Sequence, residues 1–160
     1  MSKLGRFVRL DGADQRLLLR AACWLAVARL LIASVPFRRL SAWLATESAP
    51  DCIEPEPELG PEPEQELLRR IGRAVATAAR HVPWRADCFP QAIAARMLLR
   101  RHGLPSTIHI GVTRDEGKGL SGHAWLTCGK TVVTGEMDLD RYAVLHRLPD
   151  REPPAADSRT

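Results

Sequence analysis

The sequence lacks the features of an exported or zinc-stapled protein. Its four cysteines, Cys23, Cys52, Cys88 and Cys128, form no C-x-x-C pair, which argues against a structural metal site. The opening residues, MSKLGRFVRLDGADQR, lack the apolar core and the small-residue cleavage site of a signal peptide. Free thiols without an export signal indicate the cytoplasm, where a conspicuous cysteine is better tested as a nucleophile than as half of a disulfide.

The sequence also lacks a basic stripe with interleaved aromatic residues. Its net charge is only +4, and its arginines are spread over several segments. Because a nucleic-acid-binding surface normally carries such a stripe, we expect no nucleic-acid partner. The length of 160 residues suits a single domain.

One long apolar run, residues 17–35, has the composition of a membrane anchor. Arg20 and Arg29 interrupt it, and each would be costly at the middle of a bilayer. We therefore expect a helix over residues 14–34 that is packed on most sides, with Cys23 in the core. Peripheral membrane contact is the alternative, and we expect no stable membrane insertion.

Composition and periodicity divide the rest of the chain. Pro36 ends the first helix, and a short second helix is expected after it. Residues 47–66 are rich in Pro and Glu and are expected to be exposed and mobile. Helical spacing returns over residues 65–81, and again from Cys88 towards a C-cap at Gly103. We divide this single domain into an N-terminal helical segment (1–46), a linker (47–64), a catalytic core (65–150) and a disordered tail (151–160).

Beyond this last helix the apolar period changes from about 3.6 to 2 residues. Strands are expected over residues 106–114, 123–128, 131–136 and 141–148, with Gly129-Lys130 as the turn between the middle two. Helices followed by strands predict an α+β domain with a small antiparallel sheet.

Cys88 is the best candidate for a nucleophile. Asp87 is a plausible N-cap and Pro90 fits a first helical turn, so Cys88 falls at or just before a helix start. Backbone N–H groups and the helix dipole favour the reactive thiolate there. The alternative is a small buried residue at a structural helix end. Cys128, at a hairpin corner, has no helix dipole and is expected to be exposed or half-buried.

His123 is the candidate base. If Gly129-Lys130 is a two-residue type II′ turn, strand pairing places His123 opposite Glu136, with Asp138 diagonal on the same face. A carboxylate there would fix the imidazole tautomer and leave the other nitrogen for a thiol. A loop one residue longer would place His123 opposite Gly135 instead. The alternative is a structural ring hydrogen-bonded to a neighbouring strand.

Two segments together carry a family resemblance. PWRADCFPQAIAARMLLRRHGLPSTIHIGV, followed by SGHAWLTCGKTVVTGE, resembles the transglutaminase-like leader peptidases of lasso-peptide biosynthesis, in the stand-alone protease form of the lasso B protein. The shared features are Trp84 four residues before Cys88, the Cys-Phe-Pro-Gln helix start, the Arg-Arg-His-Gly-Leu-Pro-Ser exit and the His-Ala-Trp triplet. The resemblance extends over roughly residues 15–148.

The resemblance implies a transglutaminase-like, papain-like cysteine protease fold with a Cys-His-acid triad. Cys88 matches the nucleophile and His123 matches the base. The family's usual residue type favours Asp138 as the acid, whereas strand pairing favours Glu136. The implied reaction removes the leader of a precursor peptide without a cofactor, and a separate ATP-dependent lasso cyclase then closes the ring.

The oxyanion of such a reaction needs donors, and Trp84 and Gln91 are the side-chain candidates. The fused members of the family carry an additional leader-recognition domain, which does not precede the first helix here. We therefore expect a separate leader-recognition protein as a partner. A transglutaminase-like acyltransferase and a non-enzymatic adaptor of a peptide-maturation complex are the alternative functions.

Overall fold

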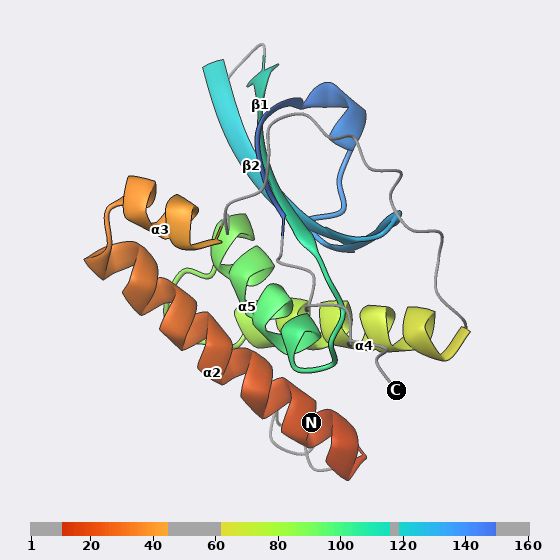
Figure 1. Cartoon of the computed structure of the whole chain (residues 1–160). Coiled ribbons are helices and arrows are strands. Elements are labelled where there is room, and N and C mark those ends of the chain that lie inside the picture. Colours follow the sequence, from red (N-terminus) through yellow and green to blue (C-terminus); the bar gives the residue numbers. More distant parts are fainter. Residues whose placement is uncertain (1–10, 45–61, 116–118, 150–160) are drawn as a thin grey trace, which may run out of the picture.

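The computed structural model describes residues 11–44, 62–115 and 119–149. Four α-helices precede and support one antiparallel sheet, which lies above them in Figure 1. The helices are α2 (Gly12–Ser34), α3 (Phe37–Leu44), α4 (Glu62–Ala79) and α5 (Cys88–Arg100). The expected linker before residue 62, the tail after residue 150 and Cys52 lie outside the described residues.

The sheet has the strand order β3-β2-β1-β4, and all its neighbours are antiparallel. A 3-10 turn, η1 (Leu139–Arg141), leads into the last strand. The α+β class predicted from the sequence is confirmed. The strands are β1 (Thr107–Asp115), β2 (Gly119–Cys128), β3 (Thr131–Thr134) and β4 (Ala143–Pro149).

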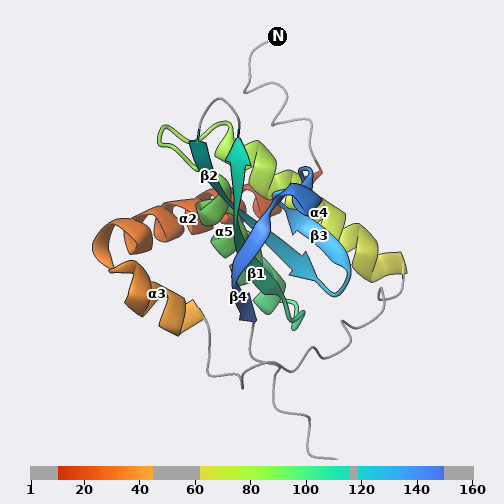
Figure 2. The same cartoon turned by 90° about the horizontal axis from the view of Figure 1, so that it is seen from above.

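Helix α5 is the centre of the fold. It packs against α2, α4 and β2, and the strands cross over it in Figure 2. Every residue from Ala92 to Leu99 is buried, so this helix has no solvent face along that stretch. The alternate residues of the sheet that face it are apolar and complete the core, including Ile108, Leu126 and Leu148.

One member of the α5 core is charged. Arg96 has no exposed surface. Its guanidinium donates hydrogen bonds to the carbonyl oxygens of Leu44 (3.0 Å) and Ser106 (3.1 Å), and to that of Leu148. Three segments far apart in the sequence are thereby joined through one side chain. The sequence pattern did not single out Arg96.

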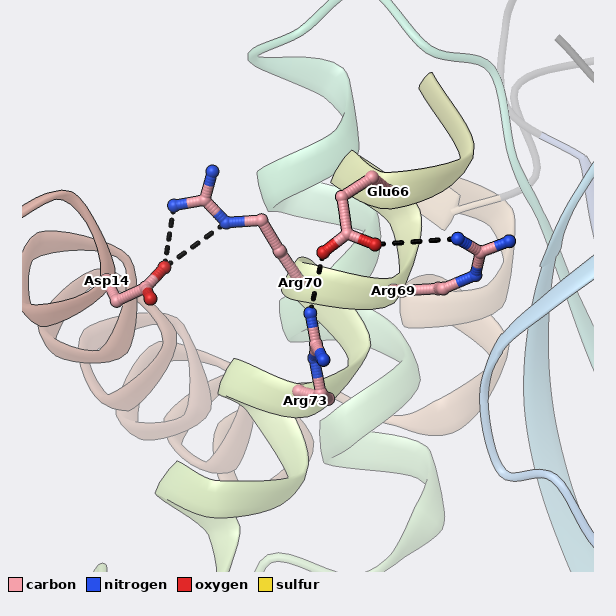
Figure 3. A network of polar contacts seen from close by, with 5 residues as sticks. All are labelled: Asp14, Glu66, Arg69, Arg70 and Arg73. Carbon is pink, nitrogen blue, oxygen red and sulfur yellow. Dashed lines mark hydrogen bonds and ion pairs between the residues drawn. The ribbon is translucent and has the colours of Figure 1, made fainter. Parts of the chain in front are cut away.

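Helix α4 lies close beneath β3 and is tied to α2. A Cβ atom on Gly72 would approach the carbonyl oxygen of Val133 to 2.4 Å, so only glycine permits this distance. On the other side of α4, Arg70 forms an ion pair of 2.6 Å with Asp14 of α2, which raises the pKa of Arg70 (Figure 3). Helix α4 therefore connects the N-terminal helix to the edge of the sheet.

Helix α2 is less covered than the sequence suggested. Only Ala21, Leu25 and Ala28 are buried, and Cys23 is exposed. The prediction of a helix packed on most sides with Cys23 in the core is wrong. Because α2 is apolar all round, its periodicity could not show that a single side contacts the protein.

Element boundaries differ from expectation at several places, and the largest difference is at β2, which begins at Gly119 rather than residue 123. Helix α4 begins at Glu62 rather than residue 65, because acidic residues in a first turn suit the helix dipole and a proline is tolerated there. Strand β3 ends at Thr134 rather than residue 136. Gly135 follows with φ +79°, a conformation that leaves the extended strand.

Candidate active site

Cys88 is the first residue of α5, and its side chain is half-buried. Asp87 precedes it as the N-cap in an extended conformation, although the Asp87 side chain makes no capping hydrogen bond. Pro90 occupies the first turn as predicted. The sulfur therefore lies where the first-turn N–H groups and the helix dipole favour an anion.

His123 lies on β2 with its ring half-buried. Its Nε2 is 2.9 Å from the carbonyl oxygen of Gly135. Trp125 stacks beside the ring at a centroid distance of 6.1 Å, and Tyr142 approaches it at 5.2 Å. The imidazole is thus fixed by one hydrogen bond and two aromatic neighbours.

The hydrogen bond to Gly135 determines the tautomer of His123. A carbonyl oxygen only accepts, so Nε2 must carry the proton and donate it. In the neutral ring Nδ1 then holds a free lone pair, as a general base requires. The backbone of Gly135 here performs the orienting role that a carboxylate has in a triad.

The strand register explains why Glu136 does not lie opposite the His123 ring. Cys128 pairs with Thr131 as the two-residue turn predicts, but Leu126 pairs with Thr134 instead of Val133. This one-residue bulge on β3 overturns the predicted pairing of His123 with Glu136.

Both predicted acids are exposed: Glu136 lies just after Gly135, and Asp138 precedes η1. Within the described part of the chain, the hydrogen-bond partner of the His123 ring is Gly135 and neither carboxylate. The assignment of Asp138 to the triad stays a prediction that rests on resemblance.

Cys88 begins α5, which packs against β2. The ring of His123 lies with Trp125 on the other face of β2, because Leu126, which alternates with these residues, faces α5. Among residues 11–44, 62–115 and 119–149, no hydrogen bond joins the Cys88 thiol to the His123 ring. Catalytic hydrogen bonds often form or tighten only when substrate binds, so the lack of this bond in the free chain does not decide the pairing. The nucleophile–base contact stays a prediction.

The two oxyanion candidates differ in availability. The Gln91 amide donates to the carbonyl oxygen of Ala86 at 2.7 Å. The indole Nε1 of Trp84 is buried and has no hydrogen-bond partner among the described residues. A buried unsatisfied donor is costly, and a ligand oxygen would satisfy it. Trp84 is therefore the stronger of the two candidates.

A second histidine on the same sheet face has a different environment. His109 stacks on Trp125 at 5.3 Å, on the side away from His123, and its Nε2 is 2.9 Å from the Thr127 hydroxyl oxygen. Burial lowers the pKa of His109 to about 4, with a further contribution from the positive charges of Arg147 and Arg96. His109 is thus a neutral structural ring.

Cys128 is not a competing nucleophile. It is buried in the core rather than exposed or half-buried, so that prediction is wrong. Burial raises the pKa of the Cys128 thiol to about 11, and the charge of Glu64 adds to the effect. The thiol form is inert at neutral pH.

Two further features of the described residues lie outside this site. They contain no group of three or more His, Cys, Asp or Glu residues arranged to hold a metal ion. A groove of about 590 Å³ between α2 and α4 is lined by apolar residues and by four of the residues in Figure 3: Asp14, Glu66, Arg70 and Arg73. Neither Cys88 nor His123 lines this groove.

A cysteine at the start of a helix and a histidine on a strand of an antiparallel sheet are the arrangement expected of a transglutaminase-like fold. Residues 31–147 match the Transglutaminase-like superfamily, a stretch that runs from the end of α2 to β4. The chain therefore belongs to the transglutaminase-like superfamily, which includes cysteine peptidases. Neither a curated protein nor a solved structure matches the chain significantly.

Proposed function

We propose that this protein is a cysteine peptidase that removes the leader from a lasso-peptide precursor. The observation that carries the catalytic part is the His123 ring, held through Nε2 with Nδ1 free, in a chain whose helix α5 begins at the half-buried Cys88. The leader substrate rests on the resemblance of the segments around both residues to lasso leader peptidases.

The proposed chemistry is acyl transfer to water. Nδ1 of His123 takes the proton of the Cys88 thiol, and the thiolate attacks the carbonyl carbon at the end of the leader. The same proton then passes from His123 to the departing amine of the core peptide. The N–H of Cys88 and the Trp84 indole donate to the oxyanion. Water, deprotonated by His123, then hydrolyses the thioester and returns the thiolate.

The released core peptide carries a free amino terminus. An ATP-dependent lasso cyclase, a separate protein, would use this amine to close the ring. A separate leader-recognition protein would bind the leader and deliver the precursor to Cys88. Efficient cleavage by this chain alone, unchanged when the recognition protein is added, would count against that partner.

The direct test is cleavage of a precursor by the purified chain with the recognition protein, followed by mass spectrometry. Cys88→Ala should abolish release of the leader, and His123→Ala should lower the rate by at least about 10³-fold, because it removes the base. Cys23→Ala is the matched control, since Cys23 is an exposed cysteine on a different helix. Leader release by the Cys88→Ala variant would contradict the proposal.

The same experiment separates hydrolysis from the two alternatives. An acyltransferase of this superfamily would join the acyl group to an amine, giving a product with a new amide instead of free leader and core. An adaptor would leave the precursor intact and would still support maturation after Cys88→Ala.

A further inference from the structure

The outward side of α2 is unusually apolar for a surface. Leu19, Val27 and Leu30 are 57%, 39% and 66% exposed, with the exposed Cys23 between them. The successive spacings of Leu19, Cys23, Val27 and Leu30 are four, four and three residues, which places them along one side of the helix. By length and composition α2 is long and apolar enough to cross a membrane, and only 17% of its most apolar 18-residue stretch is buried in the protein.

The opposite side of α2 determines what this helix can do. Ala21, Leu25 and Ala28 are fully buried against the rest of the protein. A helix fixed in this way lies along the surface of the domain, as Figure 1 shows. Its exposed side can therefore contact a bilayer surface while the fold stays intact.

The charge of this region has a single sign. Residues 15–44 contain five arginines and no Asp or Glu, whereas the whole chain has a net charge of +4, so the remaining residues sum to −1. Within the described ranges, all five arginines are exposed and form no ion pair: Arg16, Arg20, Arg29, Arg38 and Arg39.

Helix α3 continues the pattern. Phe37 and Trp43 are 51% and 53% exposed, and Arg38 and Arg39 lie between them. Tryptophan has an apolar body and a polar N–H group, a combination that favours the boundary between lipid and water. Both N-terminal helices therefore expose apolar and cationic side chains together.

We propose that α2 and α3 form a docking surface for an anionic lipid bilayer, the α2–α3 basic surface. It consists of the exposed apolar residues Leu19, Val27, Leu30, Phe37 and Trp43 and of the arginines Arg16, Arg20, Arg29, Arg38 and Arg39.

Charge complementarity selects the anionic bilayer as the occupant. The arginines are distributed along two helices and flank the apolar residues, so a plane of negative charge can meet all of them at once. Arginine stems can lie on apolar surface while their heads reach phosphate groups. Each cation near an anionic membrane strengthens binding by about fivefold.

This inference does not depend on the proposed peptidase activity. A bilayer-bound chain could cleave peptide or serve another reaction, because Cys88 and His123 are not part of the α2–α3 basic surface. Lipid binding and cleavage of a soluble precursor are therefore separable measurements.

The test is sedimentation of the full purified chain with vesicles. Vesicles of phosphatidylcholine with about one third phosphatidylglycerol should bind the chain, and vesicles of phosphatidylcholine alone should bind it at least about tenfold more weakly. High salt should release it, since the attraction is screened. Equal binding to both vesicles, or none to either, would overturn the proposal.

Substitutions locate the surface. The double variant Arg20→Glu/Arg29→Glu should lower binding to anionic vesicles by at least about tenfold, and Val27→Ser/Leu30→Ser should also weaken it. The matched control, Arg101→Glu/Arg114→Glu, makes the same charge change at exposed positions elsewhere and should change binding less than threefold. Thermal unfolding would establish that each variant is folded.

A protein partner with an acidic face is the competing explanation. It predicts that the chain stays in the supernatant with anionic vesicles, while Arg20→Glu/Arg29→Glu reduces cleavage only when the recognition protein is present. That result would overturn the lipid proposal. Equal loss of vesicle binding in the control and the test variants would overturn it as well, because net charge alone would then explain binding.

Discussion

The two faces of the sheet are built from different kinds of side chain. The face towards α5 is aliphatic, with Ile108, Leu126 and Leu148 in one continuous core. The opposite face carries rings, with Trp125 stacked between two histidines. Both faces come from the same strands, whose alternate residues point in opposite directions. The inner face holds the fold together, and the outer face orients an imidazole.

The two histidines show how finely the outer face is divided. His109 and His123 stack on opposite sides of one indole, yet the first is buried and hydrogen-bonded to a side-chain hydroxyl, whereas the second is half-buried and hydrogen-bonded to a backbone carbonyl. The degree of burial therefore distinguishes the structural ring of His109 from the ring of His123, which a substrate can reach. Substitutions on each face should therefore affect different properties.

The largest effect on stability is expected at the inner face. Arg96→Leu would leave three buried carbonyl oxygens, those of Leu44, Ser106 and Leu148, without this donor. Each such loss costs about 1–3 kcal/mol, so the three together should lower the free energy of unfolding by at least about 3 kcal/mol in urea titrations. Arg101→Leu, at an exposed position, should change it by less than about 0.5 kcal/mol. A small loss at Arg96 would show that the three carbonyls find other donors.

A second stability effect belongs to the outer face and depends on pH. The pKa of His109 is lowered from 6.5 to about 4, so the unfolded chain binds this proton more readily than the folded chain. The stabilisation is present above about pH 6.5 and is lost as the pH falls through about 4, by up to about 3 kcal/mol. Unfolding titrations of wild type and His109→Gln across this range should differ in slope. Parallel curves would contradict this role.

These features differ in how far the sequence predicts them. The helix start at Cys88 and the turn at Gly129-Lys130 follow from local signals, an N-cap with a first-turn proline and a glycine-led turn, and both are confirmed. The bulge at Val133 does not follow from local sequence signals, because it accompanies the close packing of β3 on Gly72 of α4. A tertiary contact thus decided the register, and with it the neighbour of the candidate base.

Burial was the other property that local pattern did not reveal. Arg96 lies in an arginine-rich helix and gives no sign that its partners are carbonyls from three distant segments. Helix α2 is apolar on all sides, so its sequence could not show which side remains exposed. In both cases the deciding information is which elements pack together.

The backbone of Gly135 gives a sharper test of the outer face. A Cβ atom there would lie 2.7 Å from the carbonyl oxygen of Ala124 and 2.8 Å from the Cβ of Trp125, and φ is +79°. Gly135→Ala should therefore displace the carbonyl that orients His123 and lower kcat/KM by about ten- to a hundredfold. Gly103→Ala is the matched control, because Gly103 also has a positive φ but open space around it. Equal activity losses in both variants would assign the effect to backbone strain.

The smallest effects are expected at the two acids. The Gly135 carbonyl already accepts a hydrogen bond from Nε2 of His123. Glu136→Gln and Asp138→Asn should therefore each lower kcat/KM by less than about threefold. Both side chains are exposed, so neither substitution should disturb the fold. A loss of 10²-fold or more at one position would mean that this carboxylate joins His123 when substrate binds. The outer face would then supply the acid as well as the base, and the carbonyl would hold the ring only in the free enzyme.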